Sequence, residues 1–249
     1  MFTQIYLDCD KSFEKLSSST EFEIVANGRQ GAIIGDVKDG QFPLVRTTTK
    51  YKNPAQKFKD IHYEIIEKIK KELKKENKIK DLNLNNALVE IYDSNYRKMK
   101  YHCDQAMDLT KYSYICIFSC YNDPTDLINL RTLKIKNKTT EEEQEIKMYH
   151  NSVIIFSTDT NSHNLHKIVL KEATKNNKWL GVTFRLSKSN IYFKDDKAFF
   201  TKTNEQLRVS DDEETKEFYK LRRMENKAIE FNYPELCYTI SQSDTYSIN

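Results

Sequence analysis

Tyr101-His102-Cys103-Asp104 is the stretch from which the rest of this sequence is best interpreted. His102 and Asp104 are two residues apart, so in an extended segment both side chains leave the same face of the strand. A second histidine, His166, lies far along the chain near the end of another apolar run. Two imidazoles and one carboxylate on one side of an ion leave its other side open, which suits non-haem Fe(II) with a co-substrate and O2. The pattern favours an iron-dependent oxygenase.

Composition sets the broad class of protein. The chain has 249 residues with 38% hydrophobic content, enough to bury one good core, and we expect one compact domain with decorations. The net charge of +3 permits binding to a polyanion without requiring it.

Cysteine usage and hydropathy predict the compartment. The chain has five cysteines, an odd number, and no Cys-x-x-Cys pair. This cysteine usage is typical of a protein in a reducing compartment. No apolar run approaches a membrane span, and Met1–Ile5 lacks the basic-then-apolar pattern of a signal peptide. We expect a soluble, monomeric protein of the cytoplasm or nucleus that does not bind a membrane.

The clearest predicted helix begins at Asn53-Pro54. Asn53 fits the N-cap and Pro54 the first helical position, where its missing N–H costs nothing. An apolar stripe follows at three- and four-residue spacing, comprising Phe58, Ile61, Ile65, Ile66, Ile69 and Leu73. Such a helix buries its stripe against a sheet.

Residues 86 to about 186 are predicted to form strands. The expected segments are short, apolar or alternating, and bounded by polar clusters: 87–92, 98–103, 112–120, 127–135, 145–149, 152–157, 165–170 and 180–186. About eight strands after a helix favour an α+β fold with a double-stranded β-helix (jelly-roll) core, supporting N-terminal helices and a C-terminal extension. We place the domain at 1–189, its core at about 87–187, and an extension packed on the same domain at 190–249. Within that extension, 213–230 is predicted to form a charged helix.

A His-x-Asp triplet is weak evidence alone, because with 5 His and 37 acidic residues one arises by chance at about even odds. Two further stretches strengthen it. Residues 151–168 contain an apolar strand, a polar loop and His166 entering another strand. In Trp179-Leu-Gly-Val-Thr-Phe-Arg185-Leu186, alternation places Thr183 and Arg185 on one face. A guanidinium on an inner face is costly unless paired, and a dicarboxylate co-substrate offers that pairing.

Together these stretches resemble the Fe(II)/2-oxoglutarate dioxygenase superfamily, and within it the AlkB-like branch. The matching features, over about residues 87–187, are His102-Cys-Asp104, the polar loop ending in His166-Lys-Ile, Val182-Thr-Phe-Arg185, and Glu90-Ile-Tyr92. The resemblance implies that His102, Asp104 and His166 bind the iron and that Arg185 holds 2-oxoglutarate. It also implies hydrogen bonds to 2-oxoglutarate from Tyr92 and from Thr183 or Lys178, and O2 as oxidant.

The sequence departs from the AlkB-like pattern at residues expected to bind the co-substrate. Trp179 stands where that branch has its first arginine, and Glu90 replaces an asparagine. Either Arg185 and Lys178 together hold 2-oxoglutarate in an altered pose, or its site is impaired. We favour the first, because Lys178 can serve the far carboxylate as a point charge.

The substrate prediction has more than one alternative. Alkylated nucleic-acid bases are the substrates that the resemblance implies, and we expect Arg46, Tyr101 and His163 on the substrate side. His163 also competes for the third metal position, although its spacing from His166 allows only one of the two to point inward. The alternatives are hydroxylation of a protein or small molecule, and a non-catalytic binding module. A structural zinc site is disfavoured by the Asp ligand and the absence of clustered cysteines.

Overall fold

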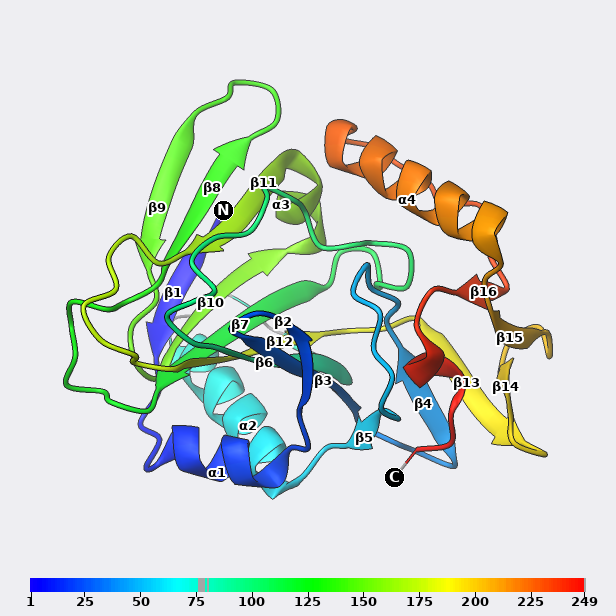
Figure 1. Cartoon of the computed structure of the whole chain (residues 1–249), viewed down its shortest axis with the longest axis horizontal. Coiled ribbons are helices and arrows are strands. Elements are labelled where there is room, and N and C mark those ends of the chain that lie inside the picture. Colours follow the sequence, from blue (N-terminus) through cyan, green and yellow to red (C-terminus); the bar gives the residue numbers. More distant parts are fainter. Residues whose placement is uncertain (76–78, 80, 249) are drawn as a thin grey trace.

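The main antiparallel sheet joins strands from distant parts of the chain. The computed structural model describes residues 1–75, 79 and 81–248. Across the sheet the strand order is β1 (Thr3–Tyr6), β10 (Ser152–Ser157), β7 (Tyr114–Tyr121), β12 (Trp179–Arg185), β6 (Asn86–Tyr92), β3 (Arg29–Gly35) and β2 (Glu23–Ala26), with β5 (Gln56–Lys57) paired to β3 (Figure 1). Strands of the predicted core therefore lie at the centre of the sheet, and strands from the first 35 residues extend both of its edges.

A smaller sheet faces one side of the main sheet. Its strands, in order, are β11 (Asn164–Val169), β8 (Thr132–Asn137) and β9 (Glu143–Lys147). The predicted strand 98–103 reaches β11 only through isolated bridges, Lys98 to Val169 and His102 to His166. The apolar cluster between the sheets joins Ile117 and Ile154 of the main sheet to Leu133 and Ile168 of the smaller one. The structure is mostly β with few helices and largely antiparallel sheets, which is consistent with the predicted α+β class.

Helices α1 (Ser12–Ser19) and α2 (Asp60–Lys75) cover the other face of the main sheet (Figure 1). The apolar stripe of α2 is buried as predicted, in one cluster with alternate residues of the sheet such as Val89, Phe118 and Val182. Alternation along each strand thus supplies two cores, one on each face of the sheet.

The predicted start of α2 is wrong. The helix begins at Asp60, because Gln56 and Lys57 pair with β3 as β5 instead. The His62 ring then accepts the Lys59 N–H at 2.9 Å and takes over the capping role assigned to Asn53. Local cap signals at Asn53-Pro54 are outweighed by the strand pairing of the residues that follow.

A third sheet connects the C-terminal region to the rest of the chain. Its order is β16 (Tyr238–Thr239), β15 (Gln206–Val209), β14 (Lys197–Phe200), β13 (Ser189–Lys194) and β4 (Gln41–Leu44). Because β4 comes from the N-terminal part, the boundary drawn at 189/190 passes through a strand that pairs with it. The remaining elements are α3 (Thr158–His163), α4 (Asp212–Lys227) and the 3₁₀ turn η1 (Gln242–Thr245). None of the helices in the described residues is both long and apolar enough to cross a membrane.

Gly181 of β12 leaves room for the side chain of Trp179. A Cβ at this position would overlap the ring of Trp179, which lies buried over the glycine. We predict that Gly181→Ala destabilises the protein by ~1–3 kcal/mol, because the Trp179 ring must leave its place. Chemical denaturation would measure the change.

Trp179→Leu supplies the control, since it removes the atoms that the added methyl group meets. The penalty of Gly181→Ala should shrink in the Trp179→Leu background. An equal penalty in both backgrounds would contradict this explanation.

Candidate metal centre and its pocket

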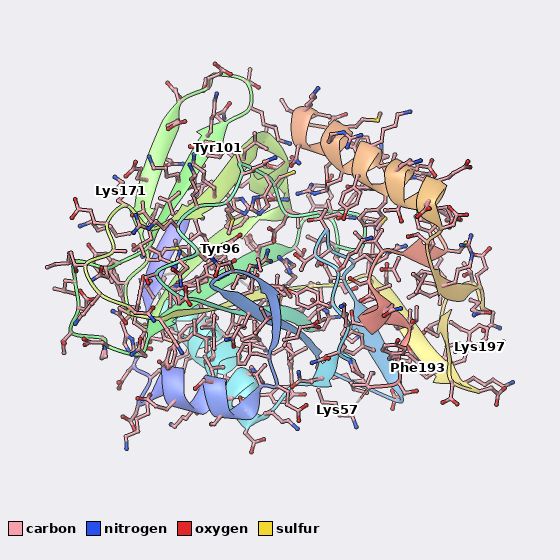
Figure 2. The ribbon with its side chains drawn as sticks, viewed as in Figure 1. Lys57, Tyr96, Tyr101, Lys171, Phe193 and Lys197 are labelled. Atoms are coloured by element: carbon pink, nitrogen blue, oxygen red, sulfur yellow. The ribbon has the colours of Figure 1, made fainter. Side chains whose placement is uncertain are left out.

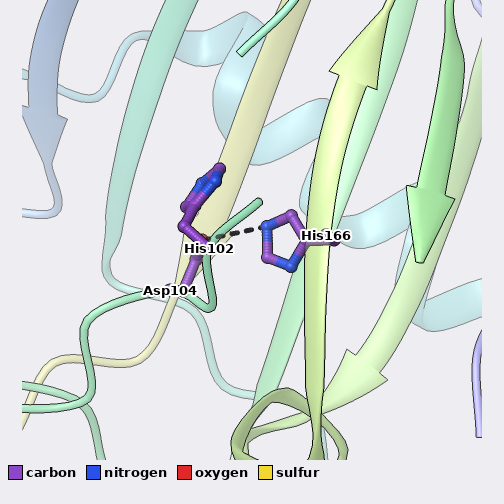
Figure 3. A group of neighbouring side chains, drawn as sticks. All are labelled: His102, Asp104 and His166. Atoms are coloured by element: carbon purple, nitrogen blue, oxygen red, sulfur yellow. Dashed lines mark ion pairs between the residues drawn. The ribbon is translucent and has the colours of Figure 1, made fainter. Parts of the chain in front are cut away.

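His102, Asp104 and His166 converge. One ligand atom from each lies within 4.8 Å of the others. The backbone bridge explains this proximity: the N–H groups of His102 and His166 each donate to the other residue's carbonyl, at 3.0 and 2.7 Å. In Figure 3 the His166 ring points toward Asp104, and its Nε2 lies 3.4 Å from Asp104 Oδ1. The set of residues expected for a metal, two imidazoles and one carboxylate, is therefore assembled in one place.

Asp104 is held on several sides. Its backbone N–H donates to Asn161 Oδ1 at 2.8 Å, and Asn161 Nδ2 returns a bond to the Asp104 carbonyl. Arg185 Nε donates to Asp104 Oδ2 at 2.7 Å. Burial alone would raise the pKa of Asp104, but Arg185 and His166 outweigh it and hold that pKa well below its usual range. The carboxyl group is an anion at neutral pH, as a metal ligand must be.

The His102 ring is neutral, and the Lys100 carbonyl fixes its orientation. Desolvation of its ring, with His166 and Arg222 nearby, lowers its pKa to about 3. Its Nδ1 lies 3.0 Å from the Lys100 carbonyl, which favours a proton on Nδ1 and leaves Nε2 as the ligand atom. These residues fit a divalent ion bound on one side.

The three residues line one pocket of about 280 Å³. Arg185, Thr183, Tyr92 and Arg46 lie in the same wall. Arg185 and Thr183 come from β12, beside the metal group, as the alternation of that strand predicts.

Lys178 is not brought to this pocket. It is exposed at the far end of β12, and its N–H is bound by Asn122 Oδ1. Arg185 lies seven positions further along extended chain, a span of roughly 20 Å. The expectation that Lys178 and Arg185 hold one co-substrate is therefore not supported by the geometry.

The residues expected on the substrate side are dispersed. Arg46 is buried and forms paired bonds with Asp108, 3.0 Å from Nε and 2.8 Å from Nη2. Tyr101 lies outside the pocket beside the small sheet, with Lys167 Nζ 3.9 Å from its ring centre (Figure 2). His163 is exposed at the end of α3 and outside the metal group, while His166 lies within it.

Sequence reasoning missed the contribution of α4. This helix bonds to residues 102–106, which carry two of the candidate ligands and are called the metal-ligand loop. Asn226 Oδ1 accepts the Cys103 N–H at 3.0 Å, and Glu225 Oε1 accepts the Ala106 N–H at 2.8 Å. Arg222 donates to the Cys103 carbonyl and to Glu225. The helix itself is signalled by the Asp211–Glu214 capping box, but no local pattern names the loop that it contacts.

We predict that His166→Ala weakens binding of Fe(II) at least ~10-fold, because one of three ligands is lost. Titration calorimetry under nitrogen measures the affinity. His163→Ala is the matched control, three positions away and exposed, and should bind as the wild type does. Equal loss in both variants would contradict the assignment.

A second prediction concerns α4. Asn226→Ala should lower metal affinity by ~10-fold, because the Cys103 N–H between the two ligands loses its acceptor and the loop loosens. The control is Arg223→Ala, a change at an exposed position of the same helix, which should leave metal affinity unchanged. Unaltered binding by Asn226→Ala, in a folded protein, would exclude a positioning role for this contact.

Comparisons with known proteins find similar chains among solved structures. No family model matches the chain, and no curated protein matches it. Among solved structures, one titled "The structure of OsALKBH1" is 14% identical with a TM-score of 0.48, covering 74% of this chain and 96% of that one. At this identity and TM-score, nothing about that protein is carried over to this chain.

Proposed function

We propose that this protein is a mononuclear non-haem Fe(II) oxygenase. The observation that carries the proposal is the group His102, Asp104 and His166, gathered in the wall of an open pocket. Two nitrogen ligands and one carboxylate on one side of the ion leave positions for a co-substrate and O2. Bound Fe(II) would supply the activation of O2 and the oxidation of a C–H bond. A structural zinc ion suits the group less well, because such a site takes four protein ligands, often cysteines, and this group offers three ligands without cysteine.

The strand order supports a double-stranded β-helix as the scaffold. From β6 onward the chain crosses from one sheet to the other at every step except between β8 and β9, which pair as a hairpin. Thus β6, β7, β10 and β12 lie in the main sheet, and 98–102, β8, β9 and β11 in the smaller one. This order suits a double-sheet jelly roll of eight strands. It sets the ligand pair after β6 opposite the third ligand on β11.

2-Oxoglutarate is the co-substrate that the resemblance implies, and one end of it fits. Arg185 Nη1 is buried and has no hydrogen-bond partner among the described residues, so it can donate to an incoming carboxylate. Thr183 lies on the same face of β12, one pleat away.

The far carboxylate of 2-oxoglutarate does not fit this pocket. The other arginines in the wall are already paired with acids: Arg29 with Glu90, Arg46 with Asp108, and Arg222 with Glu225. Lys178, the predicted partner, is elsewhere. The reaction that the residues support therefore consumes a 2-oxo acid and O2 and yields CO2, the shortened acid and a hydroxylated substrate.

Alkylated bases in single-stranded nucleic acid are the substrates that we propose to test first. Arg97, Lys98 and Lys100 are exposed, and Lys100 also lines the pocket, so phosphates could be held at its edge. Half-buried Tyr96 lines the same pocket and offers a ring for stacking. Hydroxylation of a protein or small molecule is the second candidate, since the pocket alone does not select among substrates.

Release of labelled CO2 from 1-¹⁴C 2-oxo acids tests the proposal without a known prime substrate. Anaerobically purified protein is given Fe(II), ascorbate, O2 and either 2-oxoglutarate or 2-oxobutyrate. We expect CO2 release that His102→Ala abolishes and His163→Ala retains. Metal binding without CO2 from either acid would favour a non-catalytic module instead.

A further inference from the structure

A buried carboxylate lies in the pocket wall away from the metal group. Glu90, in the middle of β6, is 7% exposed and lines the pocket. Arg29 Nε donates to its Oε1 at 2.6 Å, and the Tyr92 hydroxyl donates to its Oε2 at 2.7 Å. Both carboxylate oxygens are thus engaged by donors of the chain itself.

The strand register orders the pocket wall. On the pocket side of β12, Arg185 is followed by Thr183 and then by Gly181 toward the start of the strand. In the strand register, Thr183 pairs with Leu88 of β6 and with Ile117 of β7, and Gly181 pairs with Glu90 of β6. A 2-oxo acid bound at Arg185 would therefore extend its chain over the apolar pair Leu88 and Ile117 toward Glu90.

Arg29 and Tyr92 are the donors that a second carboxylate on such a ligand would need, and Glu90 already holds them. Arg29 also donates to Thr49 Oγ1 at 3.1 Å, so its fork is largely used. Burial and the Glu90 carboxylate raise the pKa of Tyr92 well above its usual value, so its hydroxyl remains a donor. A second anion here would meet the Glu90 charge, and the Arg29 guanidinium beside it is already paired with Glu90.

We propose that Glu90 is a resident carboxylate that determines co-substrate choice, favouring a 2-oxo acid with a single carboxylate and a short uncharged tail. The inference rests on the proposed function and names the substrate class of the same site. Glu90 is a specificity-determining residue in this scheme, and the apolar pair is the surface along which the tail lies.

The first test uses the wild-type protein, loaded with Fe(II) under nitrogen so that no turnover occurs. Calorimetry compares 2-oxoglutarate with its neutral isostere 2-oxoglutaramate and with 2-oxobutyrate. We expect both neutral-tailed acids to bind at least ~10-fold more tightly than 2-oxoglutarate, because like charges in a buried site repel.

Glu90→Gln supplies the second test. It keeps the shape of the side chain, removes its charge and leaves Arg29 able to receive an external carboxylate. The preference should move toward 2-oxoglutarate by ~10-fold or more. Glu145→Gln is the matched control, since it removes an ion-paired glutamate on β9, far along the small sheet, and should not alter the preference.

The outcomes separate the two proposals. Tighter binding of 2-oxoglutarate than of 2-oxoglutaramate by the wild type would overturn the role of Glu90 and leave the oxygenase proposal in place. Failure of every 2-oxo acid to bind protein that holds Fe(II) would overturn both. If Glu90→Gln does not fold, the comparison of acids on the wild type still decides the question.

Discussion

The mutual backbone bonds of His102 and His166 are the contact on which the site depends. They hold two histidines from distant parts of the sequence at facing positions, with ring centres 4.7 Å apart. Asp104, two residues beyond His102, then lies against the same space and is fixed there by Asn161 and Arg185. Since only a single bridge joins the strands at this point, the loop after His102 relies on neighbouring elements for its shape.

Charge balance is a second constraint on the pocket. The arginines that line it each have a carboxylate partner within the chain, and such pairing is the condition under which a buried guanidinium is tolerated. The Arg185 pair differs from the others because its acid, Asp104, is a candidate metal ligand and because Nη1 has no partner among the described residues. A ligand carboxylate therefore has one natural place in this wall, next to the metal group.

The C-terminal region is part of the site in structural terms. Strand β13 continues a sheet that begins with β4, and α4 lies against the loop that carries His102 and Asp104 (Figure 1). Asn226 and Glu225 satisfy backbone N–H groups of that loop, while Arg222 bonds to its Cys103 carbonyl. Preorganisation of this kind, by partners outside the ligand set, orients metal ligands and tunes their affinity.

The sequence by itself determined the two faces of each core strand, the apolar stripe of α2 and the identity of the three candidate ligands. Period-two and helical spacing are local properties, and they survive folding because each buried face must be apolar. Tertiary structure alone decided that α2 starts at Asp60, that Lys178 lies far from Arg185, and that Arg29 engages Glu90. Each of these depends on strand pairing between segments remote in the chain, whose register no local pattern specifies. The bonds from α4 to the metal-ligand loop are of the same kind, since more than a hundred residues separate Asn226 from Cys103.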